Sequence, residues 1–170
     1  MMKINLLPIK TQVGSHKSFS FVASAGELGI PGEQDHFDGD ITVKGQVINL
    51  GPGFKVEGTI YARAEYPCNR CLEPFFTTLE IPFEDEYQES RNETDDPQAE
   101  VAYFQGDELD LTDLIRESLL LAEPLQIVCS ENCRGLCSQC GANLNVKACS
   151  CKRNDIDPRL AALQHFLEHK

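Results

Sequence analysis

The chain lacks the short motifs by which common catalytic sites are recognised. It contains no glycine-rich phosphate loop, no nucleophile elbow and no HExxH metal motif. Its four histidines, His16, His36, His165 and His169, are not spaced as in a catalytic or metal motif, and we interpret them as surface residues. A cysteine nucleophile would need a nearby base, and the sequence offers no candidate. We therefore expect a protein that is not an enzyme and has no small-molecule substrate.

Long hydrophobic runs are also missing. The apolar run near the start, in MMKINLLPIK, is short and contains Asn5 and Pro8, so it fits neither a signal-peptide core nor a membrane span. We therefore expect a cytoplasmic protein with no membrane contact. Thiols stay reduced in that compartment, and closely spaced cysteines there indicate metal ligands in preference to disulfides.

Positive charge is scarce and unevenly placed. The net charge is -12, and residues 1–128 carry 9 Lys and Arg against 23 Asp and Glu, whereas residues 129–170 carry 6 against 4. An acidic body disfavours wide nonspecific contact with nucleic acid. Four thiolates around one zinc would carry a charge of -2 and offset the positive balance of the tail. The charges therefore favour protein contacts over extensive RNA contacts, and the candidates for binding RNA or another partner are Arg134, Lys147, Lys152 and Arg153.

The residue pattern predicts an α+β fold, with an antiparallel β-rich domain over residues 1–128 and a cysteine-rich tail over residues 129–170. A hydrophobic content of 41% is ordinary for a globular domain. We expect short strands at residues 3–9, 18–23 and near 101–104, and a loop at residues 26–39. Clear alternation of apolar and polar residues predicts longer strands at residues 41–47, 54–66 and 75–87. The acidic run at residues 84–100 indicates a solvated loop.

Two helices are expected. The first spans about residues 110–123, with Asp110 as its N-cap and an apolar stripe that packs on the sheet. The second spans about residues 157–168 in the tail, with Asp157 as its cap and Pro158 at the first helical position.

Eight cysteines form four close pairs. Cys137 and Cys140, followed by Gly141, have the form of a zinc knuckle. The preferred site therefore joins the cysteines of the tail in a zinc-ribbon-like arrangement: Cys137, Cys140, Cys149 and Cys151. A possible second site joins Cys68, Cys71, Cys129 and Cys133. The spacing is compatible with two zinc sites, or with one site and four spare thiols.

Other uses of these cysteines fit less well. A thioredoxin-type CxxC places its first thiol at a helix N-terminus, whereas Cys68 and Cys71 are flanked by predicted strands. Four cysteines also suit iron, but Cys149 and Cys151 are separated by one residue where a rubredoxin-like site has two. Zinc is the metal that the sequence favours.

Several segments in order resemble the YceD family of large ribosomal RNA subunit accumulation proteins. They are CNRCLEPF, DLTDLIRESLLLAEPL, CSENCRGLCSQCGANLN, CSC and DPRLAALQHFLE, and the likeness runs from about Ile41 to the C-terminus. The resemblance implies a bacterial or plastid protein needed for normal levels of large-subunit ribosomal RNA, and it implies no catalytic residues. The cysteine-rich tail belongs to only part of that family, so the zinc prediction depends on the spacing in this sequence.

Three hypotheses for function follow. The first is a noncatalytic ribosome-biogenesis factor that supports accumulation of large-subunit (23S) ribosomal RNA by binding precursor rRNA, a large-subunit ribosomal protein, or both. The second is an enzyme acting on rRNA or on protein thiols. The third is a zinc-stabilised protein–protein adaptor unrelated to ribosomes.

Overall fold

The computed structural model describes residues 2–32, 36–90, 102–122, 124 and 126–151. The chain divides into two compact units. Unit 1 comprises Met1–Tyr66 and Pro74–Ile127, and unit 2 comprises Pro67–Glu73 and Val128–Lys170. The segment Pro67–Glu73 thus belongs to the same unit as the cysteine-rich tail, although 54 residues separate it from Val128 in the sequence.

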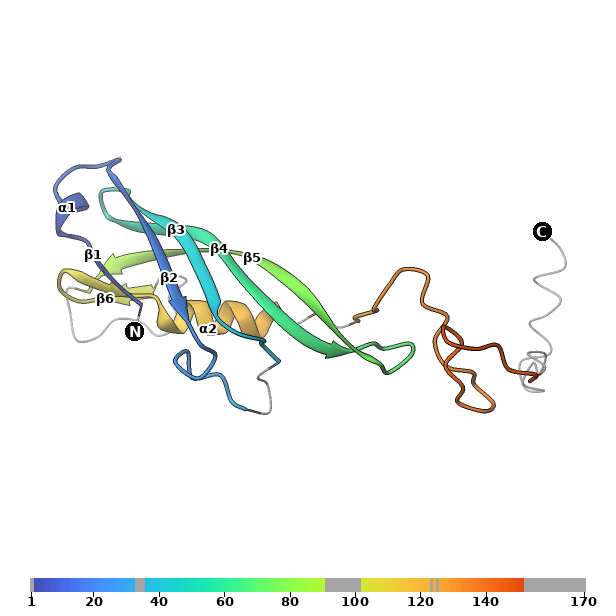
Figure 1. Cartoon of the computed structure of the whole chain (residues 1–170). Helices are drawn as coiled ribbons and strands as arrows, with labels where there is room; N and C mark the ends of the chain where they lie inside the picture. The colour runs from blue at the N-terminus through green and yellow to red at the C-terminus, as the bar shows by residue number, and fades with distance from the viewer. Residues whose placement is uncertain (1, 33–35, 91–101, 123, 125, 152–170) are drawn as a thin grey trace, which may run out of the picture. The chain divides into compact units, whose positions relative to one another are not determined.

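Unit 1 is built on a five-stranded sheet with the order β2-β3-β4-β5-β6 (Figure 1). The strands are β2 (His16–Ala23), β3 (Ile41–Asn49), β4 (Gly53–Pro67), β5 (Pro74–Glu89) and β6 (Ala102–Phe104). The pairs β2–β3 and β3–β4 are antiparallel, whereas β6 runs parallel to β5. The sheet is therefore mixed, which corrects the expectation of a purely antiparallel domain.

A second, two-stranded sheet and two helices complete the described part of unit 1. Strand β1 (Lys3–Asn5) pairs antiparallel with β7 (Glu108–Asp110). A short helix α1 (Leu7–Lys10) follows β1, and α2 (Thr112–Leu121) follows β7. Helix α2 packs against β5, as its apolar stripe predicts (Figure 1).

The hydrophobic core lies on one face of the five-stranded sheet. Alternate residues of β3 and β4 are fully buried, among them Val43, Val47, Val56 and Ile60. Their neighbours in sequence point to the other face, because successive side chains of a strand alternate in direction. Ile115 and Leu119 of α2 belong to the same core cluster. The alternation in the sequence therefore identifies the buried face correctly.

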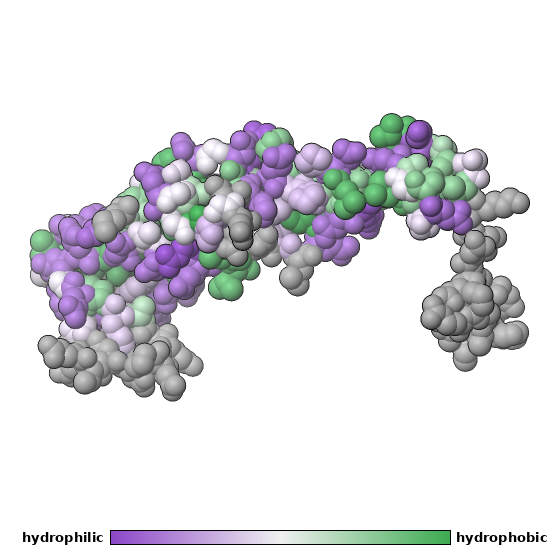
Figure 2. Space-filling model, turned by 90° about the horizontal axis from the view of Figure 1, so that it is seen from below, coloured by the Kyte–Doolittle hydropathy of each residue, from purple (hydrophilic) through white to green (hydrophobic). Residues whose placement is uncertain are grey.

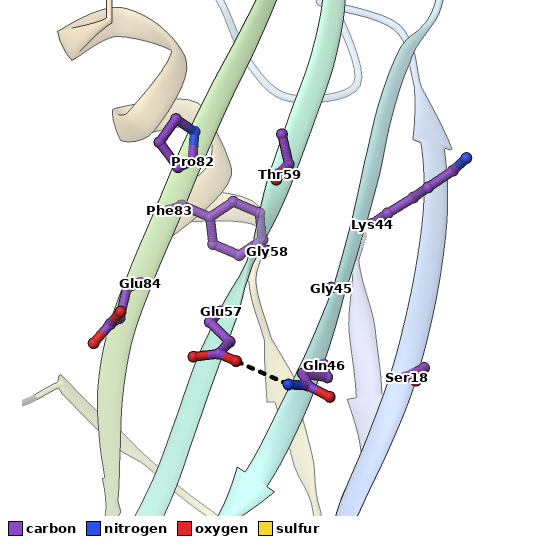
Figure 3. Close-up of a pocket in the computed structure, with 10 residues that line it drawn as sticks. All are labelled: Ser18, Lys44, Gly45, Gln46, Glu57, Gly58, Thr59, Pro82, Phe83 and Glu84. Carbon is purple, nitrogen blue, oxygen red and sulfur yellow. Dashed lines mark hydrogen bonds between the residues drawn. The ribbon is translucent and has the colours of Figure 1, made fainter.

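A pair of glycines makes room for two aromatic rings on the sheet. Gly45 of β3 is directly opposite Gly58 of β4. A Cβ atom on Gly45 would lie 2.8 Å from Cζ of Phe19, and one on Gly58 would lie 2.7 Å from Cζ of Phe83. Both distances are too short for real atoms, so these rings occupy the space that side chains would fill. Figure 3 shows the ring of Phe83 beside Gly58.

Four expectations about elements need correction or fall outside the described residues. The predicted strand at residues 3–9 is split into β1 and α1, because Pro8 suits the first turn of a helix better than a paired strand. Asp110 is the last residue of β7, not the cap of α2, whose N-cap is Leu111. The acidic run begins in β5, which continues to Glu89. The helix predicted at residues 157–168 lies outside the described residues.

The surface of the described chain is mainly polar. Figure 2 shows hydrophilic residues over much of the face in view, with small groups of apolar residues between them. Within the residues that the structure describes, no helix is long and apolar enough to cross a membrane.

Candidate metal centres

Sulfur takes the place of an apolar core in the described part of unit 2. The buried residues of this unit, over residues 67–73 and 128–151, are Cys68, Cys71, Cys133, Gly135 and Cys137. Leu72 and Val146 are instead 65% and 80% exposed. So small a unit cannot be held together by hydrophobic burial alone. The buried interior that its segments share is therefore formed mainly by thiols.

The first cluster, here called tetrad A, contains Cys68, Cys71, Cys129 and Cys133. Its four Sγ atoms all lie within 4.8 Å of one another. The distances from Cys68 Sγ to Cys133 Sγ and from Cys71 Sγ to Cys129 Sγ are both 3.8 Å. Four sulfurs at ~2.3 Å from one tetrahedral metal lie ~3.8 Å apart, whereas a disulfide joins sulfurs at ~2.05 Å. The geometry fits four ligands of one ion.

The second cluster, tetrad B, contains Cys137, Cys140, Cys149 and Cys151. Its Sγ atoms also lie within 4.8 Å of one another. Cys137 is buried, Cys149 and Cys151 are half-buried, and Cys140 is exposed. All eight cysteines have free thiols. The structure thus brings together both sets of four that the spacing suggested, and it leaves no spare thiol pair.

The two CxxC segments have the same backbone structure. In tetrad A, the amide of Leu72 donates to the carbonyl of Cys68 at 2.8 Å, and the amide of Cys68 donates to the carbonyl of Glu73 at 3.0 Å. In tetrad B, Gly141 donates to Cys137 at 2.9 Å, and Cys137 donates to Ala142 at 2.9 Å. Each segment is therefore a knuckle, a tight turn that directs two sulfurs to one point.

The residue after each knuckle has a left-handed backbone conformation. Gly141 has a φ of 69°, which glycine adopts readily. Leu72 occupies the equivalent position with a φ of 60°, although this conformation costs an L-residue about 1–2 kcal/mol. A knuckle with leucine at this position is harder to recognise from sequence, and this is why the first CxxC pair is the weaker of the two signals.

Backbone amides stabilise the thiolate form of the first cysteine in each knuckle. Burial raises the pKa of Cys68, but the amides of Cys129, Cys71 and Arg70 outweigh it and lower the pKa to about 6. The amides of Arg70 and Cys129 lie 3.4 Å from its sulfur. For Cys137, the amides of Cys140 and Gln139 lower the pKa to about 6. Both sulfurs therefore lose their protons more readily than an ordinary thiol.

One cysteine of each cluster, Cys129 in tetrad A and Cys151 in tetrad B, instead has a raised pKa. Burial, together with hydrogen bonds to Cys133 and the neighbouring sulfurs, raises the pKa of Cys129 to about 12. A hydrogen bond to Cys140 and then burial raise the pKa of Cys151 to about 12. Several thiolates cannot lie this close without a cation or protons between them. A divalent cation would replace these protons, so metal binding by either tetrad must release protons.

Two polar residues support tetrad A and are not evident as site residues from the sequence. The guanidinium of Arg70 donates through Nη1 to the carbonyls of Glu131 and Cys133, both at 3.2 Å. The amide of Asn145 donates through Nδ2 to Cys133 Sγ at 3.3 Å. The only sequence signal is their position, since Arg70 lies inside a CxxC segment and Asn145 lies between two cysteine pairs.

The residues predicted to bind RNA or a partner are only partly described. Arg134 is exposed and lines a hollow of about 450 Å³ beside tetrad B, together with Leu144, Ala148, Cys149 and Cys151. Lys147 is exposed in the turn that follows Asn143. Lys152 and Arg153 lie outside the described residues.

A further hollow, of about 750 Å³, lies on the sheet of unit 1 above the glycine pair (Figure 3). Its two carboxylates, Glu57 and Glu84, are already paired. Lys55 contacts Glu57 and Glu84, each at 3.0 Å, and Gln46 donates to Glu57 at 2.8 Å. The carboxylates of this hollow are therefore already engaged, and the tetrads remain the chemically distinctive sites of the described chain.

Comparison with known proteins supports the resemblance seen in the motifs. The model of the family described as "Large ribosomal RNA subunit accumulation protein YceD" matches residues 56–167. This stretch includes both tetrads and the helix α2.

The curated relatives include bacterial and plant proteins. The uncharacterized protein YlbN of Bacillus subtilis is 33% identical over 132 residues, which cover 75% of this chain and 74% of that protein. An uncharacterized Mycobacterium tuberculosis protein is 30% identical over 124 residues, 72% of this chain and 59% of that protein. The chain is also similar to the maize chloroplastic large ribosomal RNA subunit accumulation protein YCED homolog 1, with 44% identity over 50 residues, 29% of this chain and 17% of that one.

No solved structure matches this chain. The family model nevertheless covers well over half of the residues, including all eight cysteines. The chain therefore belongs to the YceD family.

Proposed function

We propose that this protein is a noncatalytic ribosome-biogenesis factor that supports the accumulation of large-subunit ribosomal RNA. The ribosomal part of the proposal is supported by membership of a family described by that role. The noncatalytic part is supported by one observation: all eight thiols of the chain lie in two clusters of four. A metal with four protein sulfurs has no open position for a substrate or an activated water.

Zinc is the ion that suits these clusters best. Tetrahedral sites made of four thiolates are typical of structural zinc, and the ion has no redox chemistry of its own. When bound, it would neutralise part of the thiolate charge and join Pro67–Glu73 to the segment after Val128. A cytoplasmic location, where thiols stay reduced, is part of this proposal.

The charges favour a basic ribosomal protein as the direct partner. Residues 1–128 carry a large excess of acid. The described part of unit 2 contains three basic residues, Arg70, Arg134 and Lys147, and two acidic residues, Glu73 and Glu131. Two occupied tetrads at -2 each would outweigh that small positive excess. Arg70 is moreover bonded to backbone carbonyls of its own unit. In the described part of unit 2, few cations therefore remain for phosphates, whereas complementary charge speeds association with a basic protein.

Binding measurements test the proposal and separate the two classes of partner. The full-length zinc-loaded chain is incubated with purified large-subunit ribosomal proteins and, separately, with fragments of large-subunit rRNA. We expect binding to one or more basic ribosomal proteins that weakens as salt is raised. The double variant Arg134→Glu, Lys147→Glu should leave this binding intact.

Three other outcomes lead elsewhere. Salt-sensitive binding to rRNA that is lost in the double variant would identify RNA as the partner. Binding to neither class would favour the adaptor unrelated to ribosomes. Cysteines that react as free thiols in the zinc-loaded protein would support the enzyme hypothesis instead.

A further inference from the structure

Asn145 belongs to the segment of one tetrad but contacts a ligand of the other. It lies between Cys140 and Cys149, which are both in tetrad B. Its Nδ2 atom donates to Cys133 Sγ of tetrad A at 3.3 Å and to Asn143 Oδ1 at 3.0 Å. Its Oδ1 atom accepts a hydrogen bond from the amide of Arg134 at 2.7 Å. Both polar atoms of the Asn145 side chain thus form hydrogen bonds, one of them with the ligand Cys133 and one with the residue that follows it.

The backbone of the same segment is also bonded to residues around tetrad A. The amide of Leu144 donates to the carbonyl of Gly135 at 2.9 Å. Earlier in the chain, before Cys137, the amide of Leu136 donates to the carbonyl of Arg70 at 3.0 Å. The segment 141–148, here called the B loop, therefore lies against the extended segment that leads out of tetrad A, with an isolated bridge between Leu136 and Asn143.

The B loop depends on tetrad B for its conformation. It is anchored at both ends by ligands of that tetrad, and none of its residues is buried. A loop without buried apolar side chains gains little from the hydrophobic effect. The ligation of Cys140 and Cys149 to one ion would hold its ends together and position Asn145.

The contact with Cys133 affects the affinity of tetrad A for metal. A hydrogen bond from a neutral donor to a thiolate stabilises the charged form that binds the ion. The loss of such an outer-shell hydrogen bond typically lowers metal affinity about 10–100-fold. A favourable link of this kind must act in both directions, because coupling between two binding equilibria is reciprocal.

We propose that Asn145 couples the two tetrads, so that an ion bound in tetrad B raises the affinity of tetrad A for its own ion. The inference rests on the metal sites of the proposed function, and it adds that the two ions bind cooperatively. Asn145 is a positioning residue here, since it acts on the metal through Cys133.

The test measures the occupancy of each tetrad separately in the full-length chain. Zinc is the probe, its free concentration is set by chelator buffers, and mass spectrometry identifies which cysteines resist alkylation. Four proteins are compared: wild type, Asn145→Ala, the double variant Cys149→Ser, Cys151→Ser, which disables tetrad B, and the combination of all three substitutions. Val146→Ala is the matched control, because Val146 lies in the same turn with its side chain 80% exposed.

We expect Asn145→Ala to raise the free zinc needed for half-protection of Cys133 at least about tenfold. Disabling tetrad B should weaken tetrad A by a similar factor, and adding Asn145→Ala to that variant should change nothing further. Val146→Ala should match wild type. In the reverse direction, Cys68→Ser should weaken protection of tetrad B.

Two kinds of result would overturn the proposal, and they differ from each other. Equal half-protection of Cys133 in wild type and Asn145→Ala would show that Asn145 does not couple the tetrads. The same conclusion would follow if the loss from Asn145→Ala multiplied the loss from disabling tetrad B. Either result would leave the metal sites themselves intact. Cysteines alkylated at every zinc concentration in wild type would overturn the metal sites themselves. Neither readout depends on a ribosomal partner.

Discussion

At the scale of single residues, Gly135 shows how closely the chain just before the second knuckle approaches the backbone of the first knuckle. Its φ is 71°, and a Cβ atom at this position would lie 2.9 Å from the carbonyl oxygen of Arg70. Gly141 has almost the same φ of 69°, but a Cβ atom there would meet nothing within 4 Å. Glycine is thus required at residue 135 for two reasons and at residue 141 for only one.

Alanine substitutions of these two glycines can therefore be compared as a matched pair. Gly141→Ala should destabilise unit 2 by about 1–2 kcal/mol through the backbone conformation alone. Gly135→Ala should cost more, because the backbone of Arg70 must also move. The measurement is the chelator concentration that releases half of the bound zinc. Equal effects of the two substitutions would show that the close approach to Arg70 is not maintained in solution.

At the scale of elements, the strands were predictable and the short connecting elements were not. In strands β3, β4 and β5, apolar and polar residues alternate over long runs, so only one face of each strand is apolar enough to be buried. Strand β7 has three residues, of which only Leu109 is buried, so no period can be read from it. An aspartate before an apolar stripe resembles an N-cap, so the sequence predicts Asp110 as the cap of α2. Pairing of β7 with β1 instead places the start of the helix at Thr112.

Asp110 still supports the start of α2, and its contribution depends on pH. Its Oδ1 atom accepts a hydrogen bond from the amide of Thr112 at 3.0 Å and another from the Thr112 hydroxyl. Burial raises the pKa of Asp110, but the two bonds from Thr112 outweigh it and lower the pKa below 3.8. A depressed pKa means that the charged group stabilises the fold above about pH 4, and that this contribution is lost as the pH falls below that value.

We therefore expect Asp110→Asn to be less stable than wild type at neutral pH by about 0.5–1 kcal/mol. The difference should shrink as the pH falls below about 4 and the wild-type carboxylate takes up its proton. Urea unfolding at a series of pH values measures it. A difference that is constant from pH 7 to pH 3 would show that the charge of Asp110 contributes nothing.

At the scale of the whole molecule, the two units are stabilised in different ways. The core cluster contains only residues of unit 1. The interior of the described part of unit 2 is formed by cysteines and one glycine. The spacing of the cysteines suggested the composition of both tetrads. It could not show that Asn145 contacts Cys133, because that contact depends on how the B loop folds back.

This division predicts the effect of removing one ligand. Cys140→Ser should release metal from tetrad B and loosen unit 2, whereas unit 1 keeps a core to which Cys140 does not contribute. Hydrogen exchange by mass spectrometry would show faster exchange over residues 128–151 and unchanged protection of β3, β4 and α2. Loss of protection throughout the sheet would mean that the units do not fold independently.

We propose that eight thiolates hold two zinc ions and thereby stabilise a unit whose described part lacks an apolar core. Elemental analysis of the full-length protein, purified under reducing conditions without added metal, tests it most directly when combined with titration of reactive thiols. We expect two zinc ions per chain, and thiols that become reactive only after a chelator or denaturant is added. Protein that contains no metal, or whose cysteines are joined in disulfides, would contradict it.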